Sequence, residues 1–403
     1  MSIEVVRSLL RNFLEKNIYN SSSFLELYEK DFNNLLSKKD FYFDLDFSVL
    51  EKILQKITPK VVSEFSQNIN YSSKDYECTF INGIFQSNRS YLPEGTTVLS
   101  LNEAKNTFAS FFELQKDRWK EKEKKLFFLL NKIASQEGIF LFFPKFLKKP
   151  INFTLKNIVN DPLSMATPCL HILVGNGVSV NMNIEQDFSI SKELFLNGII
   201  DVFLGINSSL IISQKNHSLQ KCSLFKFWSI RATLSERASF SSYFLDEARD
   251  NSIIYYDLHL LLEGMFSSAC IQSGISLKEK AEGIVKVQID HLGSNTSSIQ
   301  TIKAIVDDEA KNSFEGGIFI SPEAQKADAY QKFSGLMLAE KSFIKASPQL
   351  KILADDVKAS HGASIKQLEE DLIFYLKTRG LSQIYAEQLL IESFFNDLVL
   401  NAF

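Results

Sequence analysis

Apolar and polar residues follow two different patterns along the chain, and the change falls near residue 138. Before it, apolar residues recur at spacings of three and four, as at Leu10, Phe13 and Leu14. That spacing is typical of amphipathic helices, and the aromatic-rich stretch 102–136 continues it. The sequence therefore predicts a mostly helical N-terminal domain over residues 1–137.

One short stretch of this N-terminal part predicts strands instead. The apolar residues 79–81 (TFI) and 84–85 (IF) flank the pair Asn82-Gly83. Asn-Gly between apolar runs is the strongest short-range signal for a β-hairpin, because both residues tolerate positive φ angles. The run 92–95 (LPEG) indicates a second turn shortly afterwards.

From residue 138 to residue 363 the chain consists of short β-rich runs separated by polar breaks. Val178, Val180, Met182 and Ile184 alternate with polar residues, as in a half-buried strand. Many such runs without helical spacing between them indicate an all-β domain. A sandwich, a barrel and a β-solenoid all fit this pattern, and no clean repeat period chooses among them.

The C-terminal segment reads as helical again. An apolar segment at 350–354 leads into the polar run 355–363, after which Ser364 and Gln367 have the S-x-x-Q spacing of a capping box. The polar run is therefore expected to join a strand to a helix, followed by a C-terminal helical hairpin over 364–403. Such a hairpin is too small to bury its apolar faces alone, so it should pack on the β domain, on a partner, or on both.

Charge and cysteine content narrow the class of protein. The 403-residue chain has a formal net charge of -4, which disfavours nucleic acid or an anionic membrane as the main partner. No apolar run reaches the roughly 20 residues of a membrane span, and the N-terminus lacks a signal-peptide pattern. The four cysteines are scattered without metal-ligand spacing. A cytoplasmic protein with reduced thiols is expected.

His361 is the sharpest candidate for chemistry, because imidazole binds iron or zinc and carries protons near neutral pH. Judged alone, a single His in a turn is more often structural or merely exposed. Asp355 and Asp356 are adjacent, so on a strand they would point to opposite faces and could not flank one glycosidic bond. Ser360 lacks the G-x-S-x-G elbow of a serine hydrolase. No P-loop is present, so the chain is not expected to be an ATPase itself.

Several of these segments together resemble the SufB/SufD family, the scaffold subunits of the Suf iron–sulfur cluster assembly system, and most of all its SufD members. The resemblance is carried by 355–363 (DDVKASHGA), by 314–316 (FEG) and 322–330 (PEAQKADAY) before it, and by 374–380 (FYLKTRG) after it. It covers about the last quarter of the chain well. The implied fold is mainly β, with a right-handed parallel β-helix core over residues 138–363 between the N-terminal helical domain and the C-terminal hairpin.

The resemblance also implies a function. A SufD-like chain is a scaffold subunit and not an enzyme. It pairs with a SufB-like paralogue, or with itself where the paralogue is absent, and it binds a SufC-like ABC-type ATPase through the C-terminal hairpin. His361 would then be a ligand of a transient Fe–S cluster at the subunit interface. Relatives often have Cys where this chain has Ala359, so further ligands would come from another subunit. The family's assembly has been associated with a reduced flavin, for which these residues indicate no site.

Two other functions remain open from the sequence. A β-helix carbohydrate-active enzyme is the main alternative, and it predicts a groove of acidic and aromatic residues and activity of the isolated chain. A purely structural adaptor is the other, and it predicts that replacing His361 has no effect.

Overall fold

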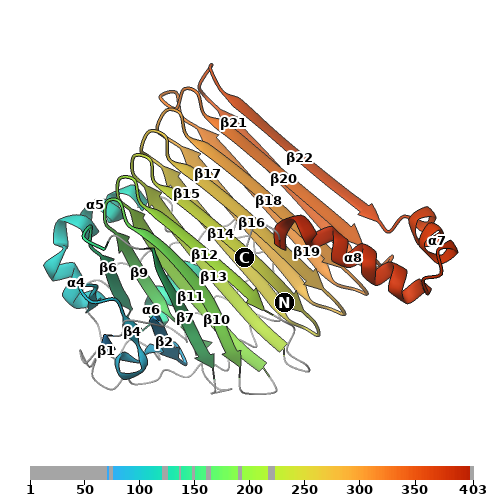
Figure 1. Ribbon diagram of the computed structural model, residues 1–403, viewed down its shortest axis with the longest axis horizontal. Coiled ribbons are helices and arrows are strands. Elements are labelled where there is room, and N and C mark those ends of the chain that lie inside the picture. Colours follow the sequence, from blue (N-terminus) through green and yellow to red (C-terminus); the bar gives the residue numbers. More distant parts are fainter. Residues whose placement is uncertain are drawn as a thin grey trace, which may run out of the picture.

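The computed structural model describes residues 70–71, 76–119, 126–135, 138–147, 150–159, 165–188, 193–216 and 223–399. This part of the chain is mainly β, and its strands form two long sheets that face each other as a parallel β-solenoid (Figure 1). The predicted fold class is confirmed. The helix predicted around Leu10, Phe13 and Leu14 lies outside the described residues.

The first described segment builds the predicted hairpin. Asn82 and Gly83 have φ angles of 50° and 82°, and they connect two antiparallel strands. Gly95 has a φ of 87° in the second predicted turn. The elements of this segment are β1 (Asn70–Tyr71), β2 (Tyr76–Ile81), β3 (Ile84–Phe85), the 3-10 helix η2 (Ser87–Arg89), β4 (Tyr91–Leu92) and β5 (Thr97–Ser100).

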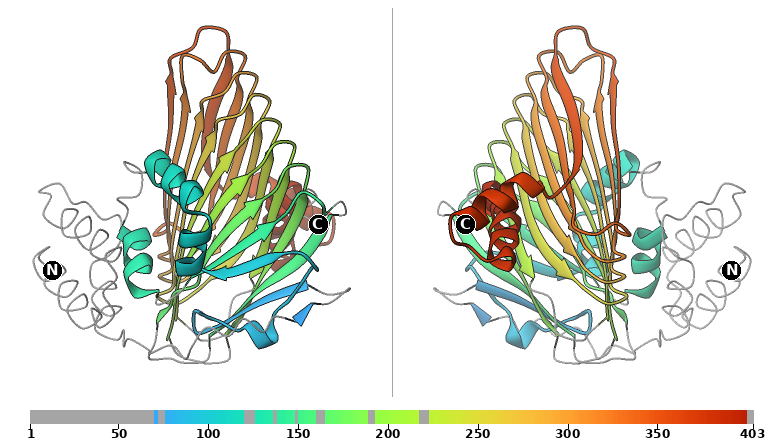
Figure 2. Two further views of the ribbon diagram at one scale, coloured as in Figure 1. Left: turned by 90° about the vertical axis from the view of Figure 1, so that its left-hand side faces the viewer. Right: turned by 90° about the vertical axis from the view of Figure 1, so that its right-hand side faces the viewer.

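Three helices follow, as the spacing of apolar residues predicts: α4 (Leu101–Thr107), α5 (Ala109–Trp119) and α6 (Leu126–Ala134). A capping box starts α4, where the Glu103 amide donates to Ser100 Oγ and the Ser100 amide donates to Glu103 Oε2. The two bonds satisfy amides that a helix start leaves free. These helices lie against the outer face of one sheet of the solenoid (Figure 2).

The chain passes back and forth between the two sheets of the solenoid. The parallel strands of one sheet, with the short β8 beside them, are β6 (Ile139–Phe143), β8 (Met165–Ala166), β9 (Cys169–Val174), β11 (Glu193–Leu204), β13 (Ser223–Leu234), β15 (Ile253–Leu262), β17 (Glu282–His291), β19 (Lys311–Ile320) and β21 (Phe343–Ile352). The other sheet holds β7 (Ile151–Val159), β10 (Ser179–Phe188), β12 (Ser209–Asn216), β14 (Ser239–Ala248), β16 (Ser268–Leu277), β18 (Ser297–Val306), β20 (Asp328–Met337) and β22 (Lys358–Gln367).

Successive strands of a sheet pair residues that are separated by one complete coil. The separation is nearly constant along the solenoid, from the pairing of Phe225 with Ile253 to that of Lys311 with Phe343. Each coil therefore contributes one strand to each sheet, and equivalent positions of successive coils stack on one another.

The turns at one edge of the solenoid stack in the same way. One residue in each turn has a φ angle between 53° and 60°, and its amide donates to a carbonyl in the turn of the next coil. The ladder runs through the amides of Asn207, Arg237, Phe266, Asn295 and Lys326. It satisfies backbone groups of the turns that the ladders between strands do not reach.

The main hydrophobic core fills the space between the two sheets. In β14 alternate residues are buried, so one face of the strand points inward and the other faces outward. In β13 every residue from Leu224 to Leu234 is buried, because helix α6 covers its outer face and Phe127 stacks on Phe227 with the ring centroids 4.0 Å apart. The helical layer thus creates a second, smaller core outside the solenoid.

The C-terminal end departs from the sequence prediction in one respect. Residues 358–367 form the last strand, β22, and the first helix of the hairpin, α7 (Glu370–Thr378), begins only after it. The capping box predicted at Ser364 and Gln367 is therefore wrong. Parallel pairing with β20 along the whole of β22 outweighs that local signal. The proposed division into domains at residues 137 and 363 stays a prediction.

The helical hairpin itself is confirmed, and it packs back on the solenoid. Helix α8 (Gln383–Val399) lies across the sheet opposite to the one that α4–α6 cover (Figures 1 and 2). Lys303 Nζ donates to the Phe394 carbonyl over 2.7 Å, and Leu398 and Phe395 lie against Gly274 of β16. No helix among the described residues has the length and apolar character needed to cross a membrane.

Candidate functional site

The predicted site lies at the open end of the solenoid. Among the described residues, β22 is the last strand of its sheet and β21 the last strand of the other. Every residue of β22 is exposed except Ala359, which is half-buried. Large apolar side chains are exposed around this end, among them Phe343, Leu353 and Ile365. An edge strand of this kind is a ready template for pairing with another chain.

The outer edge of β22 presents its backbone groups in a fixed order. The Lys358 amide donates to the Ala327 carbonyl at the start of β20. In a parallel strand, alternate residues hydrogen-bond to opposite neighbours. The backbone N–H and C=O groups of Ala359, His361, Ala363 and Ile365 therefore point away from β20, toward the open edge.

His361 occupies an inward-facing position of this last coil. It pairs in register with Gln331 of β20, whose side chain is buried while its neighbours Tyr330 and Lys332 are exposed. Paired residues of parallel strands point to the same face, so His361 continues the inner face of the sheet. Its side chain is exposed because no further coil covers it among the described residues.

Below His361 the inner face carries two glutamines. Gln331 Nε2 donates to Gln300 Oε1 over 2.7 Å, and Gln300 pairs in register with Gln331. Gly316 of the opposite sheet makes room for them, because a Cβ there would lie 2.0 Å from Gln331 Nε2. Phe314, two residues earlier, stacks on Phe333 with centroids 5.1 Å apart. The motif 314–316 therefore shapes the inside of the last coils.

The acidic pair Asp355 and Asp356 lies in the turn between β21 and β22 and not on a strand. The Asp356 carbonyl accepts from the Lys326 amide over 2.6 Å, and its amide donates to Gln325 Oε1 over 3.0 Å. Gln325 Nε2 also donates to the Pro322 carbonyl. The motif 322–330 thus holds the final turn in place through the backbone of Asp356.

The described residues do not bring other metal ligands to His361. They contain no group of three or more His, Cys, Asp or Glu side chains that could hold a metal ion. Ala359, next to His361 on the inner face, offers no donor atom. Within this part of the chain, His361 therefore belongs to no cluster of three such ligands.

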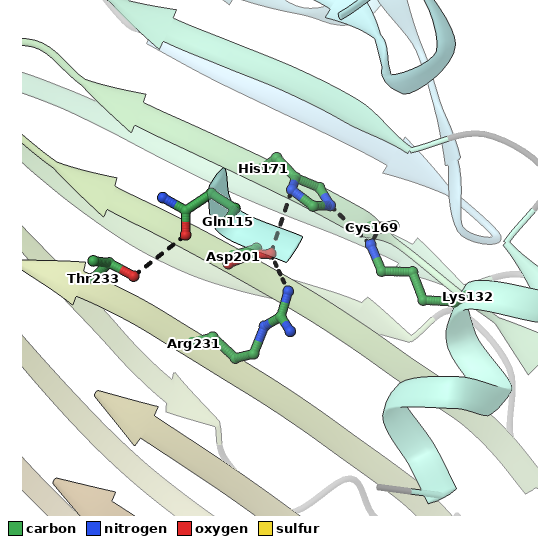
Figure 3. A network of polar contacts seen from close by, with 7 residues as sticks. All are labelled: Gln115, Lys132, Cys169, His171, Asp201, Arg231 and Thr233. Atoms are coloured by element: carbon green, nitrogen blue, oxygen red, sulfur yellow. Dashed lines mark hydrogen bonds and ion pairs between the residues drawn. The ribbon is translucent and has the colours of Figure 1, made fainter. Parts of the chain in front are cut away.

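A second polar cluster, which the sequence analysis did not predict, lies under the helices (Figure 3). His171, Asp201 and Arg231 stand at paired positions of β9, β11 and β13. His171 Nδ1 is 3.5 Å from Asp201 Oδ2, and Arg231 forms an ion pair with the same carboxylate oxygen. From helix α6, Lys132 Nζ lies 2.8 Å from His171 Nε2 and 3.3 Å from the sulfur of Cys169.

This cluster holds His171 in its neutral form. Burial lowers the pKa of His171 well below its usual value, and the charges of Lys132, Arg231 and Lys105 lower it further. Lys132 donates to Nε2, so the ring proton sits on Nδ1, facing Asp201. Arg231 also stacks on the rings of Phe128 and Trp119, at 4.2 and 4.8 Å from their centroids. The cluster fastens the helices to the solenoid.

A third polar group lies inside the solenoid itself. Lys226 of β13 is fully buried, and its Nζ is 2.7 Å from Asp246 Oδ1 of β14. The other carboxylate oxygen of Asp246 accepts from the Tyr256 hydroxyl over 2.6 Å. Burial lowers the pKa of Lys226, and the Asp246 carboxylate opposes this change.

The remaining histidines and cysteines have local roles. His259 Nε2 contacts Asp290 at 3.1 Å, and His291 lies between Thr296 and Ser298. Cys78, Cys169 and Cys270 are free thiols, as the scattered spacing predicts. His217 and Cys222 lie outside the described residues.

These features define a parallel β-solenoid subunit with an exposed terminal strand and a helical hairpin folded back on one sheet. The chain belongs to the SufBD family, because the family model described as "SUF system FeS cluster assembly, SufBD core domain" matches residues 157–394, more than half of its length. The SufB/SufD resemblance seen in the motifs is thereby confirmed.

Individual relatives agree with this assignment. An iron–sulfur cluster assembly SufBD family protein of Synechocystis is 27% identical over 344 residues, which cover 79% of this chain and 72% of the relative. The iron–sulfur cluster assembly protein SufD of Escherichia coli is 36% identical over 110 residues, 27% of this chain and 26% of that protein. A chloroplastic protein of Arabidopsis thaliana is 36% identical over 115 residues, 28% of this chain and 24% of the relative. The last two matches thus span about a quarter of each relative.

Proposed function

We propose that this chain is a SufD-like scaffold subunit that assembles Fe–S clusters together with a SufB-like paralogue and a SufC-like ABC-type ATPase. The observation that carries the proposal is the end of the solenoid, where an exposed edge strand holds the family motif with His361 on its inner face. The polar clusters around His171 and Lys226 hold elements of the fold together, so we propose a scaffold and not an enzyme. A cytoplasmic location remains a prediction.

The edge of β22 is the proposed pairing surface for the paralogue. Its outward N–H and C=O groups can add a strand from a second chain, and Ile365 and Leu353 beside it would be buried on pairing. A second copy of this chain could pair in the same way where the paralogue is absent, because a two-fold interface uses the same surface twice.

The hairpin is the proposed surface for the ATPase. Its helices leave large apolar side chains exposed while α8 stays attached to the solenoid, and an apolar patch of this kind marks a protein-binding site. The exposed residues are Leu372, Phe374, Tyr375, Ile384, Tyr385 and Leu389. ATP binding and hydrolysis in the partner would move this hairpin and so reshape the scaffold interface.

His361 is proposed to help receive or hold the iron and sulfur that the complex assembles. Iron–sulfur clusters are cargo here, and their usual ligands are thiolates. Since Ala359 supplies none, the remaining ligands would come from the paired subunit. A neutral imidazole can bind iron through one nitrogen.

Two observations argue against the main alternative from the sequence, a carbohydrate-active enzyme. It needs two carboxylates on either side of a substrate, whereas Asp355 and Asp356 lie in a hydrogen-bonded turn. The family of the chain is also one of Fe–S cluster assembly.

The first experiment is a pull-down of the tagged chain from its native cell extract, with bound proteins identified by mass. Recovery of an ABC-type ATPase and a paralogous solenoid subunit supports the proposal, and recovery of the chain alone contradicts it. In the purified complex, His361→Ala should lower the yield of clusters. Ser360→Ala is the matched control, because Ser360 lies next to it on the outward face. Unchanged cluster yield with His361→Ala would favour a purely structural adaptor.

A further inference from the structure

The inner face of the sheet carries a ladder of polar side chains that ends at His361. Gln300, Gln331 and His361 stand at paired positions of β18, β20 and β22. Gln300 is fully buried and Gln331 is 3% exposed. Neighbouring strands lie about 4.8 Å apart, so the side chains of each pair are within reach of one another.

The hydrogen bonds of this ladder run in one direction. Gln300 Nε2 donates to the Gly317 carbonyl over 3.4 Å, and Gln331 Nε2 donates to Gln300 Oε1 over 2.7 Å. The Gly317 carbonyl can only accept, so Gln300 must turn its NH2 group toward Gly317 and its oxygen toward Gln331. Gln331 must then turn its own NH2 group toward Gln300. The Gly317 carbonyl therefore decides which end of each side-chain amide is NH2 and which is oxygen. The two ends have nearly the same shape and could not be assigned without it.

One acceptor is left over at the upper end. Gln331 Oε1 is buried and has no hydrogen-bond partner among the described residues. A buried polar atom without a partner costs stability and calls for an explanation. His361 stands at the paired position of the next coil, and in this structure neither of its ring nitrogens hydrogen-bonds Gln331 Oε1.

We infer that Gln331 is a positioning residue for His361: its amide oxygen accepts the N–H of one imidazole nitrogen and leaves the other nitrogen free to bind metal. A neutral histidine has one N–H and one lone pair, and the partner of the N–H decides which nitrogen carries the proton. Histidines that bind metal commonly donate their second nitrogen to a carbonyl or carboxylate. The inference rests on the proposed function for the metal, but the hydrogen bond itself does not.

Two neighbouring features support this assignment. Gly316 gives the Gln331 amide its space, since any side chain there would collide with Nε2. One coil earlier, the apolar residue Ile271 occupies the position paired with Gln300. Ser242 occupies the same position one coil before Ile271, and glutamine occurs in this column only in the two coils before His361.

The test is the tautomer of His361, measured by long-range 1H–15N correlation on the full chain with 15N-labelled histidine, alone and in its purified complex. His361→Asn identifies the signal by its loss. We expect a roughly tenfold excess of one tautomer in at least one of the two states, as one ordinary hydrogen bond would give. Gln331→Met and Gln331→Ala should each abolish that excess. Either apolar variant that folds is sufficient.

The control is Lys332→Met, which changes the next residue of β20 on the outward face and should leave the tautomer unchanged. An even mixture in the native chain in both states overturns the inference, and so does an excess that persists in Gln331→Met or Gln331→Ala. Cluster assembly is measured separately in the complex. If Gln331→Met changes the tautomer but not the yield of clusters, Gln331 positions His361 without limiting cluster assembly, and His361→Ala then decides whether His361 has the proposed metal role.

Discussion

Single residues in this protein depend on partners from neighbouring coils, and Lys226 is the clearest case. Its amine is fully buried in the solenoid, where the Asp246 carboxylate compensates its charge and the Tyr256 ring lies 4.9 Å from it. Removing one member of such a pair leaves an uncompensated buried charge, whereas removing both charges does not. The contribution of the Lys226–Asp246 pair to the free energy of unfolding should therefore be measured with single and double substitutions.

Lys226→Met should lower the free energy of unfolding by about 3–5 kcal/mol. Combining it with Asp246→Asn should recover part of this loss, because Asn removes the charge and still accepts from the Tyr256 hydroxyl. Denaturant unfolding of the wild type, both single variants and the double variant measures the coupling. If the two single losses simply add, the buried charges do not interact as the structure indicates.

His291 should make the protein sensitive to acid. Its Nδ1 faces Thr296 Oγ1 and its Nε2 faces Ser298 Oγ, each at 2.8 Å. Burial lowers its pKa from 6.5 to about 4. Between pH 6.5 and about pH 4, His291 is therefore protonated in the unfolded chain but neutral in the folded chain. The free energy of unfolding is highest above pH 6.5 and decreases as the pH falls to about 4.

The expected loss is about 1.4 kcal/mol per pH unit within this window. Urea unfolding at pH 7 and pH 5 measures it, and His291→Gln should make the difference between the two smaller. Because His171 is also held neutral by burial and by Lys132, part of the acid sensitivity should persist in that variant. Identical pH dependence of the variant and the wild type would contradict the assignment to His291.

The sequence predicted functional residues that are close together along the chain, but not those that are far apart in the sequence and meet only in the fold. His361 stands out because its neighbours form a contiguous motif, and the structure places it on the exposed terminal strand. The cluster of His171, Asp201 and Arg231 has no such motif, because its members lie one coil apart in the sequence and meet only through the stacking of coils. The recurrence of polar residues at that interval was its one signal in the sequence.

At the scale of elements, local patterns predicted those whose cause is local. The Asn82-Gly83 hairpin and the helices after Ser100 formed as expected, since the turn and the capping box act within a few residues. The helix start at Ser364 was wrong because pairing with β20 is a long-range interaction that no local pattern records. Each coil repeats the same fold with different residues, so the structural repeat left no clean period in the sequence.

The attachment of α8 depends on the absence of a side chain at Gly274. A Cβ there would lie 2.8 Å from Leu245, 3.1 Å from Leu398 and 3.2 Å from Phe395. Gly274→Val should therefore loosen the helix from the sheet without opening the core. We expect limited proteolysis to release the hairpin at least several-fold faster while the solenoid stays resistant, since cleavage follows local opening.

Gly362→Val is the matched control for this substitution. Gly362 belongs to the same sheet, and a Cβ there meets no atom within 4 Å. Its hairpin should be cleaved at the native rate. Equal cleavage of both variants and the wild type would mean that Gly274 does not govern the attachment of α8.

At the scale of the whole molecule, a solenoid has two ends, and each must be covered or paired. Coils contact only their neighbours, so an end coil lacks half of its interactions unless something covers it. Here the described chain leaves β22 and the apolar residues around it exposed, while the helices α4–α6 and α8 cover the outer faces of the sheets (Figure 2). The exposed end is the part of the molecule that an assembly would complete.

Ala363→Pro separates the pairing of this end from its folding. The Ala363 amide points away from β20, so proline removes one donor of the open edge and leaves the pairing with β20 intact. The isolated chain should change in stability by no more than about 0.5–1 kcal/mol. If a second chain adds its strand here, the substitution should weaken that complex roughly tenfold or more, through the lost hydrogen bond and the clash of the ring. Size-exclusion chromatography and quantitative co-purification measure it, with Ala363→Ser as the control that keeps the amide. A complex that survives Ala363→Pro with native affinity would show that the partner binds elsewhere, and the pairing proposed for β22 would have to be abandoned even if His361 proved necessary for cluster assembly.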